Sequence, residues 1–480
     1  MNGTGIKDGT QAGSGGPGGR IAPSAAAHPL LGSLPELRAD SLGAFLRAHR
    51  TYGDVVQLHA GPPGLRRTVY CVYSPEGVQQ VLASESGNFR KDNAIYQEIR
   101  LSLGNGLLTS QDGTYQRQRR LVQPLFTRRR VDGYAQAVAT ETATLLDSWR
   151  RRDATTLDLA GEMTGLALRT VTRILFGTDV DAAADIVDRS FPVITHYTLR
   201  RGYSPLNPPR NWPTPGNRRA AAAIRELYAV CDRIIAGRGP VAGGSDGAEG
   251  SEEAAQDLLT LLAGARSAGE AAFDADELRD QVLIFLLAGH ETTATSLAFS
   301  LHLLGLNPEV QERARAEVLS VLGDRDPVAA DLDALPLLTR VLKEAMRLYP
   351  AAPVIGRRAV AATVVDGHEI PAGADVIVAP WVSHRDPRYW PEPERFDPDR
   401  FLPEAEAARP RYAWFPFGGG PRACIGQHFS MLESVLALAM LLRAHTFEGV
   451  PGEIPLAAEI TLRPSVPVPT RIGPVGPRAS

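Results

Sequence analysis

Hydrophobic residues recur at every third or fourth position through much of the chain, which is the spacing of an amphipathic helix. This pattern predicts mainly helical structure from about residue 134 to residue 235. It also predicts single helices over residues 34–52, 275–305, 331–348 and 425–442. Helices therefore dominate the predicted fold.

Short runs of β-branched and aromatic residues indicate a smaller strand component. DVVQLHA (54–60) and RTVYCVY (67–73) are typical of strands, and the Pro- and Gly-rich region 350–400 contains β-like runs such as DVIVAP. The predicted fold class is therefore mainly α with a minor β component, an α+β fold.

Two segments interrupt the helical pattern. SPLNPPRNWPTPG (204–216) contains five prolines and cannot form the interior of a helix. GRGPVAGGSDGAEGSEE (237–253) is rich in Gly and Glu and is typical of a surface loop. We interpret both as loops rather than domain linkers. The Gly-rich N-terminus predicts a disordered tail over residues 1–27, followed by a single domain over 28–480.

Charge and hydropathy exclude several classes of protein. The 480 residues include 51 Lys and Arg against 54 Asp and Glu, so the basic excess typical of nucleic-acid-binding proteins is missing. The sequence has no run of roughly 18 consecutive apolar residues, and its N-terminus lacks the apolar core of a signal peptide. We expect a monomeric cytoplasmic protein with no membrane anchor and no nucleic-acid partner.

The three cysteines do not form a disulfide scaffold, because three in a chain of this length are too few. Cys71 in TVYCVY and Cys231 in LYAVCDRII lie among apolar residues, so we expect both to be small buried hydrophobic side chains. Cys424 has different surroundings and is the candidate for chemistry.

Cys424 ends a glycine-rich loop within FPFGGGPRACIGQHFSMLE, residues 415–433. Three consecutive glycines allow backbone angles that other residues avoid, and they allow close approach to a large group. A helix is predicted to begin just after Cys424, and a helix N-terminus stabilises a thiolate. Arg422 adds a positive charge that could pair with a carboxylate.

Three interpretations of Cys424 follow from these residues alone. It could be a buried structural residue, or a nucleophile activated by His428 one helical turn later. It could also be a metal thiolate. A single Cys without a CxxC partner is a poor zinc site, but one Cys is enough to bind haem iron.

Phe417-x-x-Gly420-x-Arg422-x-Cys424-x-Gly426 resembles the haem-binding signature of the cytochrome P-450 family at every defined position. The resemblance implies that Cys424 is the axial ligand of heme b (iron protoporphyrin IX), with Gly418 also in the haem-binding loop. It also implies the fold of that family, a triangular helical prism around haem.

A second segment, Ala288-Gly289-His290-Glu291-Thr292-Thr293, lies in the long apolar helix. Taken alone, the threonine could bond back to a carbonyl one turn earlier and kink the helix. The segment resembles the oxygen-activating part of the family's central helix. The resemblance implies that Gly289 leaves room for dioxygen beside Ala288, that Thr292 hydrogen-bonds the bound oxygen, and that Glu291 delivers protons through water. We interpret His290 as a packing or polar contact.

Glu344-x-x-Arg347 is spaced like a surface ion pair, which alone has little structural value. Together with Pro393-Glu394-Arg395-Phe396 it resembles the family's buried Glu-Arg-Arg triad. The resemblance implies a structural network of Glu344, Arg347 and Arg395 that fixes the loop beneath the haem.

A further match, Gly113-x-Tyr115-x-x-x-Arg119-Arg120-x-x-x-Pro124-x-Phe126, resembles the family's haem-propionate segment. Tyr115 stands where many members have Trp or His, but its hydroxyl could still contact a propionate. The resemblance also implies propionate contacts from Arg119 and Arg357.

The resemblance implies a monooxygenase that inserts one oxygen atom from O2 by hydroxylation or epoxidation. The sequence carries no nicotinamide or flavin fingerprint, so we expect a ferredoxin or flavodoxin, with its reductase, to donate electrons at the thiolate side near Arg422. The alternatives are a haem-thiolate peroxygenase and, outside enzymes, a haem-based sensor. Neither explains why Glu291 and Thr292 stand side by side.

By correspondence with the family, the substrate pocket is largely apolar, which suits a lipophilic molecule. We expect a secondary metabolite, either a terpenoid or a polyketide, with a fatty acid as the alternative. The turn near Thr461 is also predicted to contact substrate. The other predicted pocket residues are Ile95, Tyr96, Leu107, Leu287, Val354 and Ile355.

Overall fold

The computed structural model describes residues 18–177, 181–204, 207–236 and 273–474. The α-helices there are α1 (Leu34–Ala39), α2 (Ser41–Tyr52), α3 (Pro75–Gln79), α4 (Ala94–Leu103), α5 (Asp112–Val122), α6 (Arg128–Asp132), α7 (Ala135–Arg151), α8 (Leu159–Phe176), α9 (Asp181–Tyr203), α10 (Pro215–Ala236), α12 (Ala275–Leu306), α13 (Pro308–Leu322), α14 (Asp331–Ala334), α15 (Pro336–Leu348), α16 (Pro380–Ser383), α17 (Pro403–Ala407) and α18 (Gln427–Ala444).

The strands form small sheets. The largest has the order β1-β2-β8-β5-β3, in which only the β2–β8 pair is parallel. Smaller sheets are β4-β12-β9, β10-β11 and β6-β7. The bounds are β1 (Val55–Ala60), β2 (Arg67–Val72), β3 (Phe89–Arg90), β4 (Thr156–Asp158), β5 (Ile355–Ala359), β6 (Thr363–Val365), β7 (His368–Ile370), β8 (Asp375–Val378), β9 (His445–Gly449), β10 (Leu456–Ala458), β11 (Leu462–Pro464) and β12 (Pro469–Pro474).

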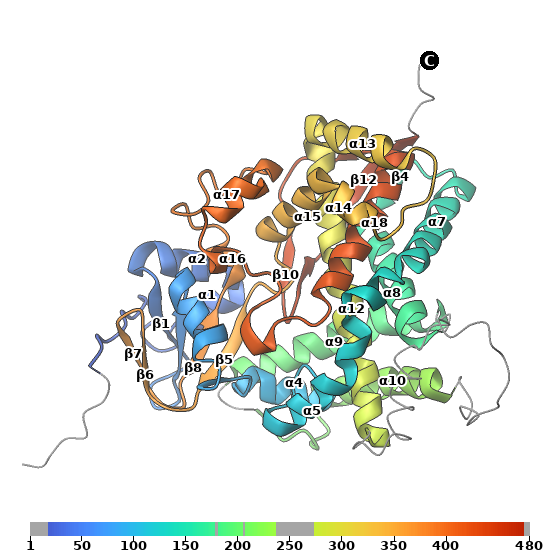
Figure 1. Ribbon diagram of the computed structural model, residues 1–480. Helices are drawn as coiled ribbons and strands as arrows, with labels where there is room; N and C mark the ends of the chain where they lie inside the picture. Colours follow the sequence, from blue (N-terminus) through green and yellow to red (C-terminus); the bar gives the residue numbers. More distant parts are fainter. Residues whose placement is uncertain (1–17, 178–180, 205–206, 237–272, 475–480) are drawn as a thin grey trace, which may run out of the picture.

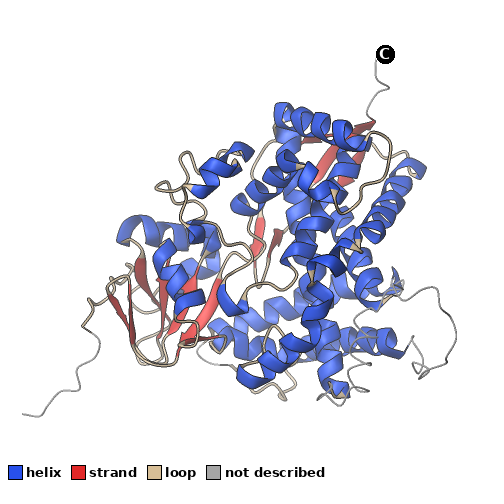
Figure 2. Cartoon of the chain, in the orientation of Figure 1, coloured by secondary structure: helices blue, strands red, loops and turns tan. Residues whose placement is uncertain are grey.

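The largest sheet is separated from most of the helices, while the smaller sheets β4-β12-β9 and β10-β11 lie among them. The five-stranded sheet and the β6–β7 hairpin lie at one side of the molecule, and most long helices lie at the other (Figures 1 and 2). Helix α12 runs through the helical part and packs along α8. Its length and composition would allow it to cross a membrane, but most of its apolar stretch is buried inside the fold, as in the core helix of a globular protein.

The predicted elements are largely confirmed, with two helices divided. The predicted helix over 34–52 breaks at Asp40, whose carboxylate accepts from the Gly43 N–H at 2.8 Å and caps α2. The predicted helix over 331–348 breaks before Pro336, which opens α15. The proline-rich segment does separate α9 from α10, whereas the 237–253 loop falls outside the described residues.

The predicted boundary of the N-terminal tail at residue 27 is wrong for the part that is described. Ala22 is buried, and the Arg20 N–H donates to the Gly367 carbonyl at 2.8 Å. The Glu369 N–H in turn donates to the Arg20 carbonyl at 2.9 Å. Backbone pairing with the β6–β7 hairpin therefore orders residues that composition alone assigned to the tail. Residues 1–17 lie outside the described chain.

Cys71 and Cys231 are buried, as predicted. Burial raises the pKa of each thiol to about 12. Neither is a thiolate at neutral pH, so neither has the reactivity expected of a metal ligand or nucleophile.

Glu344 and Arg347 form a buried ion pair on α15, and both side chains are fully enclosed. Two nearly parallel hydrogen bonds of 2.6 and 2.8 Å join the guanidinium to the carboxylate. Arg347 also donates to the carbonyls of His384 at 2.9 Å and Pro393 at 2.6 Å. The pair therefore ties α15 to the segment that follows α16, and it is not a surface pair.

The predicted third member of this network, Arg395, is wrong. Its side chain is 61% exposed and pairs with Glu392 at 3.1 Å, so only its backbone carbonyl reaches Arg347. Arg400 is 10% exposed, and its Nε lies 3.5 Å from Glu344 Oε1. Both arginines precede a phenylalanine, in Glu-Arg-Phe and Asp-Arg-Phe, which is why the sequence pattern did not separate them.

We expect Arg400→Met to destabilise the protein and Arg395→Met to leave its stability nearly unchanged. Removing Arg400 leaves the buried Glu344 carboxylate with Arg347 alone, at a cost of roughly 1–3 kcal/mol, less than for breaking the whole pair. Arg395 is a surface residue, and its replacement should stay within about 0.5 kcal/mol. Thermal unfolding of the two variants checks this, and equal melting temperatures would contradict the assignment of Arg400.

Candidate active site

The cysteine loop is shaped by glycines at two positions where another residue would be strained. Gly418 and Gly420 have φ of 70° and 64°, in the left-handed region. A Cβ on Gly420 would lie 2.0 Å from the Leu82 carbonyl oxygen. Only glycine therefore allows the cysteine loop to pack this closely against the backbone at Leu82. The Cys424 N–H donates to the Phe417 carbonyl at 2.9 Å and closes the loop just before α18 begins.

The Cys424 thiol keeps accessible surface although it lies deep in the protein. Burial raises its pKa, while a backbone hydrogen bond from Gly426 and the charges of Lys91 and Arg119 act in the opposite direction. The thiol therefore has positive charge and an N–H donor directed at it, which is the environment of a thiolate ligand.

His428 does not activate this cysteine. Its Nε2 lies 3.1 Å from Asp132 Oδ1, in an ion pair at the start of α18. A nucleophilic cysteine needs a base within hydrogen-bonding reach, and the base nearest in sequence is engaged elsewhere. The geometry therefore disfavours the cysteine-nucleophile interpretation.

Helix α12 has one accessible stripe in an otherwise buried stretch. Ala288 is exposed and Thr292, one turn later, is half-buried, whereas residues 281–287 are buried. The Thr292 hydroxyl donates to the Ala288 carbonyl at 2.8 Å, the back-bond predicted from the sequence. A hydroxyl that donates one bond can still accept another. Thr292 can therefore interact with a partner on this face.

Gly289 lies where two helices pack closely together. A Cβ at this position would lie 2.7 Å from a methyl group of Val171 on α8. The absent side chain therefore lets α8 pack closely against α12, and the role of leaving room for dioxygen stays a prediction.

Glu291 lies on another face of α12 and is almost enclosed. It accepts a hydrogen bond from the Thr461 hydroxyl, and Arg463 Nε lies 3.7 Å from its Oε1. Burial raises the pKa of Glu291 to about 7, although Thr461 and Arg463 counteract the effect. The carboxyl can thus gain or lose a proton near neutral pH. Thr461, predicted to contact substrate, contacts this acid instead.

His290 makes the predicted local contacts. Its Nδ1 lies 2.7 Å from the Leu286 carbonyl, and its ring meets Phe191 edge-on with centroids 6.1 Å apart. Burial lowers the pKa of His290 to about 4, so the ring is neutral.

Four cationic side chains gather around the Cys424 side of the site, and we call them the cation cluster. In the described part of the chain, no carboxylate lies within ion-pair distance of any of them. Burial lowers the pKa of Lys91 well below its usual value, and Arg357 and Arg422 lower it further. Burial also lowers the pKa of Arg422 to about 10. The members are Lys91, Arg119, Arg357 and Arg422.

This donor set fits heme b, which carries two carboxylates on its propionate groups, together with a thiolate ligand for iron. The cation cluster would supply charge for the propionates, and Cys424 would supply the thiolate. Lys91 was missed in the sequence, where it stands in FRKDN with no motif around it. Only its proximity to Arg357, Arg422 and Cys424 in the fold identifies it.

Tyr115 holds the cysteine loop in place through its hydroxyl. That hydroxyl donates to the Pro421 carbonyl at 2.7 Å and accepts from Arg119 at 2.8 Å. The Arg422 guanidinium lies over the ring, 3.5 Å from its centre, and donates to the Ser110 carbonyl at 2.9 Å. Tyr115 therefore contacts the cysteine loop directly, and its predicted propionate contact stays a prediction.

The predicted pocket residues lie on elements around this site. Ile355 begins β5, and its Cδ1 is 3.7 Å from where a Gly418 Cβ would stand. The Tyr96 ring, on α4, lies 5.3 Å from Lys91 Nζ. The Leu107 N–H donates to Gln281 on α12 at 3.1 Å. The remaining predicted residues are Ile95 and Val354, which are half-buried, and Leu287, which is buried.

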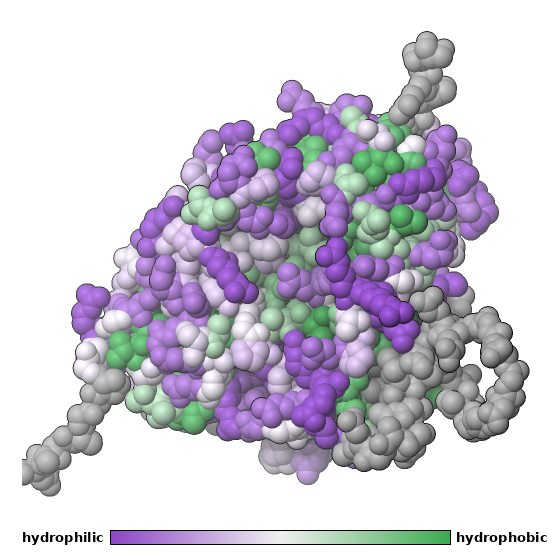
Figure 3. Space-filling view, viewed as in Figure 1, coloured by the Kyte–Doolittle hydropathy of each residue, from purple (hydrophilic) through white to green (hydrophobic). Residues whose placement is uncertain are grey.

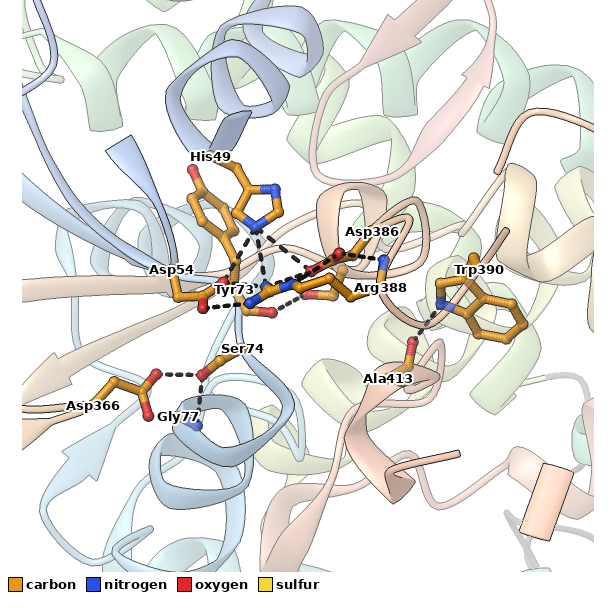
Figure 4. Close-up of polar contacts among 11 residues, drawn as sticks. His49, Asp54, Tyr73, Ser74, Gly77, Asp366, Asp386, Arg388, Trp390 and Ala413 are labelled. Carbon is orange, nitrogen blue, oxygen red and sulfur yellow. Dashed lines mark hydrogen bonds and ion pairs between the residues drawn. The ribbon is translucent and has the colours of Figure 1, made fainter. Parts of the chain in front are cut away.

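A separate cluster of His49, Asp54 and Asp386 has the composition of a metal site. Figure 4 shows that Arg388 lies between the two carboxylates. Its Nη1 donates to Asp54 at 2.9 Å and its Nε to Asp386 at 3.0 Å. Burial tends to raise the pKa of Asp54, but hydrogen bonds from His49 and Arg388 hold it well below its usual value. The guanidinium thus provides the positive charge, and the cluster is structural.

Comparison with known proteins gives consistent relatives. The family model described as Cytochrome P450 matches residues 22–470. Cyclooctatin synthase of Streptomyces melanosporofaciens is 37% identical, over 85% of this chain and 86% of that protein. Pentalenene oxygenase of Streptomyces avermitilis is 32% identical, over 83% of this chain and 85% of that protein.

The fold has a close counterpart among solved structures. The crystal structure of the cytochrome P450DA heme domain superposes with a TM-score of 0.82 and 27% sequence identity, covering 96% of this chain and 99% of that chain. The family match, the fold and the thiolate site agree. This chain therefore belongs to the cytochrome P450 family, with heme b as its cofactor and monooxygenase activity.

Proposed function

We propose that this enzyme oxidises a terpenoid secondary metabolite, inserting one oxygen atom from O2 by hydroxylation or epoxidation. The observation that carries the oxygenase role is the placement of Thr292 on the accessible stripe of α12 with the titratable Glu291 beside it. The substrate class is supported by relatives named cyclooctatin synthase, cyclooctat-9-en-7-ol 5-monooxygenase and pentalenene oxygenase, at 37%, 34% and 32% identity.

Binding the cofactor falls to Cys424 and the cation cluster. Cys424 would supply a thiolate ligand to the haem iron, and the cation cluster would hold the propionates. When bound, the haem supplies the redox chemistry that activates O2. Arg119 also donates to the Ala423 carbonyl at 3.3 Å, so a propionate contact would be transmitted directly to the cysteine loop.

Thr292 and Glu291 divide the handling of protons. The Thr292 hydroxyl, anchored on the Ala288 carbonyl, can accept a hydrogen bond from a water molecule and hold it on the accessible stripe. Glu291, with a pKa of about 7, can release a proton to such a water and regain one from solvent.

Electrons would come from a ferredoxin or flavodoxin and its reductase. The docking face would be the thiolate side, where Arg120 on α5 and Arg128 on α6 are exposed. Figure 3 shows that hydrophilic residues predominate on the face that carries α5 and α18. We also propose that the chain acts as a cytoplasmic monomer and that its described residues from 28 onward belong to one domain. The family match over residues 22–470 supports the single domain.

We expect terpenoids to produce a substrate-induced shift of the haem spectrum, and polyketides or fatty acids of similar size to bind more weakly. The purified enzyme should give product with NADPH only when a ferredoxin and its reductase are added. Binding titrations followed by reconstituted turnover measure both. Tighter binding and faster oxidation of fatty acids would contradict the proposed substrate class.

Cys424→Ser should lose the red-shifted Soret band of the ferrous–CO complex, because serine supplies no thiolate opposite CO. The matched control is Cys231→Ser, which changes a buried thiol on α10 and should keep the band in whatever protein folds. Absorption spectra of the two CO complexes decide the question. A Cys424→Ser variant with an unchanged thiolate spectrum would show that another residue is the ligand.

Thr292→Ala should retain haem and substrate affinity but form less product per NADPH, with more hydrogen peroxide, since the Thr292 hydroxyl would no longer hold a water molecule on the accessible stripe of α12. We expect at least a roughly tenfold loss of coupling, a smaller effect than the roughly 10²–10⁴-fold rate contribution typical of a positioned proton-transfer group. Ser300→Ala is the control, because Ser300 makes the same back-bond on α12, to Ser296 at 2.7 Å, and is fully buried. Unchanged coupling in Thr292→Ala would remove Thr292 from the mechanism.

A further inference from the structure

The segment 104–110, which follows α4, connects α12 to the cysteine loop, and we call it the strap. At one end the Asn105 N–H donates to Asp280 Oδ2 on α12 at 2.6 Å. At the other end the Ser110 carbonyl accepts from Arg422 at 2.9 Å. The strap therefore lies between the helix that carries the accessible stripe and the loop that carries the thiol.

Asp280 holds two separate elements with one carboxylate. Its Oδ2 accepts from the strap, and its Oδ1 accepts from the Tyr228 hydroxyl on α10 at 2.8 Å. Burial, followed by the bond to Asp280, raises the pKa of Tyr228, so the phenol keeps its proton and is the donor. Each carboxylate oxygen thus has its own partner, and Asp280 joins α10 to the strap across α12.

The strap approaches α12 too closely for side chains at two of its positions. Gly104 has φ of 83°, and a Cβ there would lie 2.0 Å from Asp280 Oδ1. A Cβ on Gly106 would lie 2.6 Å from Ile284 Cδ1 on α12. The strap backbone therefore lies directly against the helix, where the direction of the Asp280 carboxylate determines its position.

Tyr228 is itself held in a fixed direction. The Arg279 guanidinium lies 4.9 Å from the centre of the Tyr228 ring. Its Nε lies 2.6 Å from Asp232 Oδ1, which is also on α10. A cation placed over an aromatic ring is attracted to its face. The ring is thus fixed between α10 and α12, and its hydroxyl has a defined orientation toward Asp280.

The strap is bonded internally, so it can move as a unit. The N–H groups of Thr109 and Ser110 both donate to the Gly106 carbonyl, at 3.0 and 2.9 Å. The Thr109 hydroxyl donates to the Gly104 carbonyl at 2.7 Å. The strap also carries Leu107, one of the predicted pocket residues. Holding the strap at Asp280 therefore holds Leu107 as well.

We propose that Asp280 is a positioning residue for substrate binding, whose two hydrogen bonds hold the strap to α10 as a fixed wall of the haem pocket. The proposal rests on the proposed function, because that pocket is where the lipophilic substrate would bind. A loosened wall still admits a small ligand, but it binds a large apolar ligand less tightly, because ordering the wall again costs free energy. Asp280 thus controls affinity according to ligand size.

Tyr228→Phe tests the clamp from the α10 side by removing one hydroxyl. Amide hydrogen exchange of the ferric holoenzyme should become faster over the strap and stay unchanged over β1. Asp280→Ala should have a larger effect, because it removes both bonds. The matched control is Tyr52→Phe, which loses a bond from the Ala26 N–H at 2.7 Å on the sheet side. Unchanged exchange over the strap in either Tyr228→Phe or Asp280→Ala would overturn the clamp.

Imidazole and clotrimazole, a small and a bulky apolar nitrogen ligand of haem iron, test the wall by absorption titration. We expect Asp280→Ala to bind clotrimazole several-fold more weakly, with haem content and imidazole affinity unchanged. Asp280→Asn should restore most of the affinity, since its oxygen can accept from Asn105 and its amide can donate to the Tyr228 hydroxyl. Equal losses for both ligands, no loss for either, or no rescue by Asp280→Asn would each contradict the positioning role.

These measurements need neither turnover nor a terpenoid, so their failure is distinct from failure of the proposed function. If the Asp280 variants behave as expected but no terpenoid binds or is oxidised, the substrate class is wrong and the role of Asp280 stands. If terpenoids are oxidised but exchange and clotrimazole affinity are the same in Asp280→Ala as in the unmodified enzyme, only the positioning role is wrong.

Discussion

The cation cluster is the constraint on which the rest of the structure depends. Its four side chains come from the residue after β3, from α5, from β5 and from the cysteine loop, so they join the sheet side to the helical side. Like charges in a poorly solvated region repel and need anions. No described carboxylate provides that charge, whereas haem propionates would. Cofactor binding at this cluster would therefore stabilise the fold by linkage.

The buried network around Glu344 balances its charges in a different way. Glu344 is buried with Arg347 and Arg400, and the remaining guanidinium donors are satisfied by carbonyls. This network carries its own compensating charges, so it can hold the segment after α16 without a ligand. The Glu344 network thus has its charges balanced by protein groups alone, whereas the cation cluster would gain its counter-charges from the cofactor. That division explains why a structural network lies next to a binding site.

The sequence predicted those features that a local pattern encodes. Helical periodicity located the long helices, and the spacing around Cys424 predicted a thiolate ligand. Features set by tertiary contact were missed or misassigned. Lys91 has no motif, Arg395 and Arg400 stand in similar contexts, and the packing of Gly289 against Val171 depends on a helix far away in sequence. Long-range proximity decides such roles, and a single sequence does not contain it.

Helix α12 shows how one helix serves three purposes through its periodicity. Ala288 and Thr292 are four residues apart and share the accessible stripe, Gly289 admits α8, and Glu291 reaches β11. An acid placed four residues from Thr292 would lie on the same face and could not reach that strand. An adjacent acid lies about 100° away, toward another face. The adjacency of Glu291 and Thr292 therefore places a titratable carboxyl and an alcohol on neighbouring faces of one buried helix.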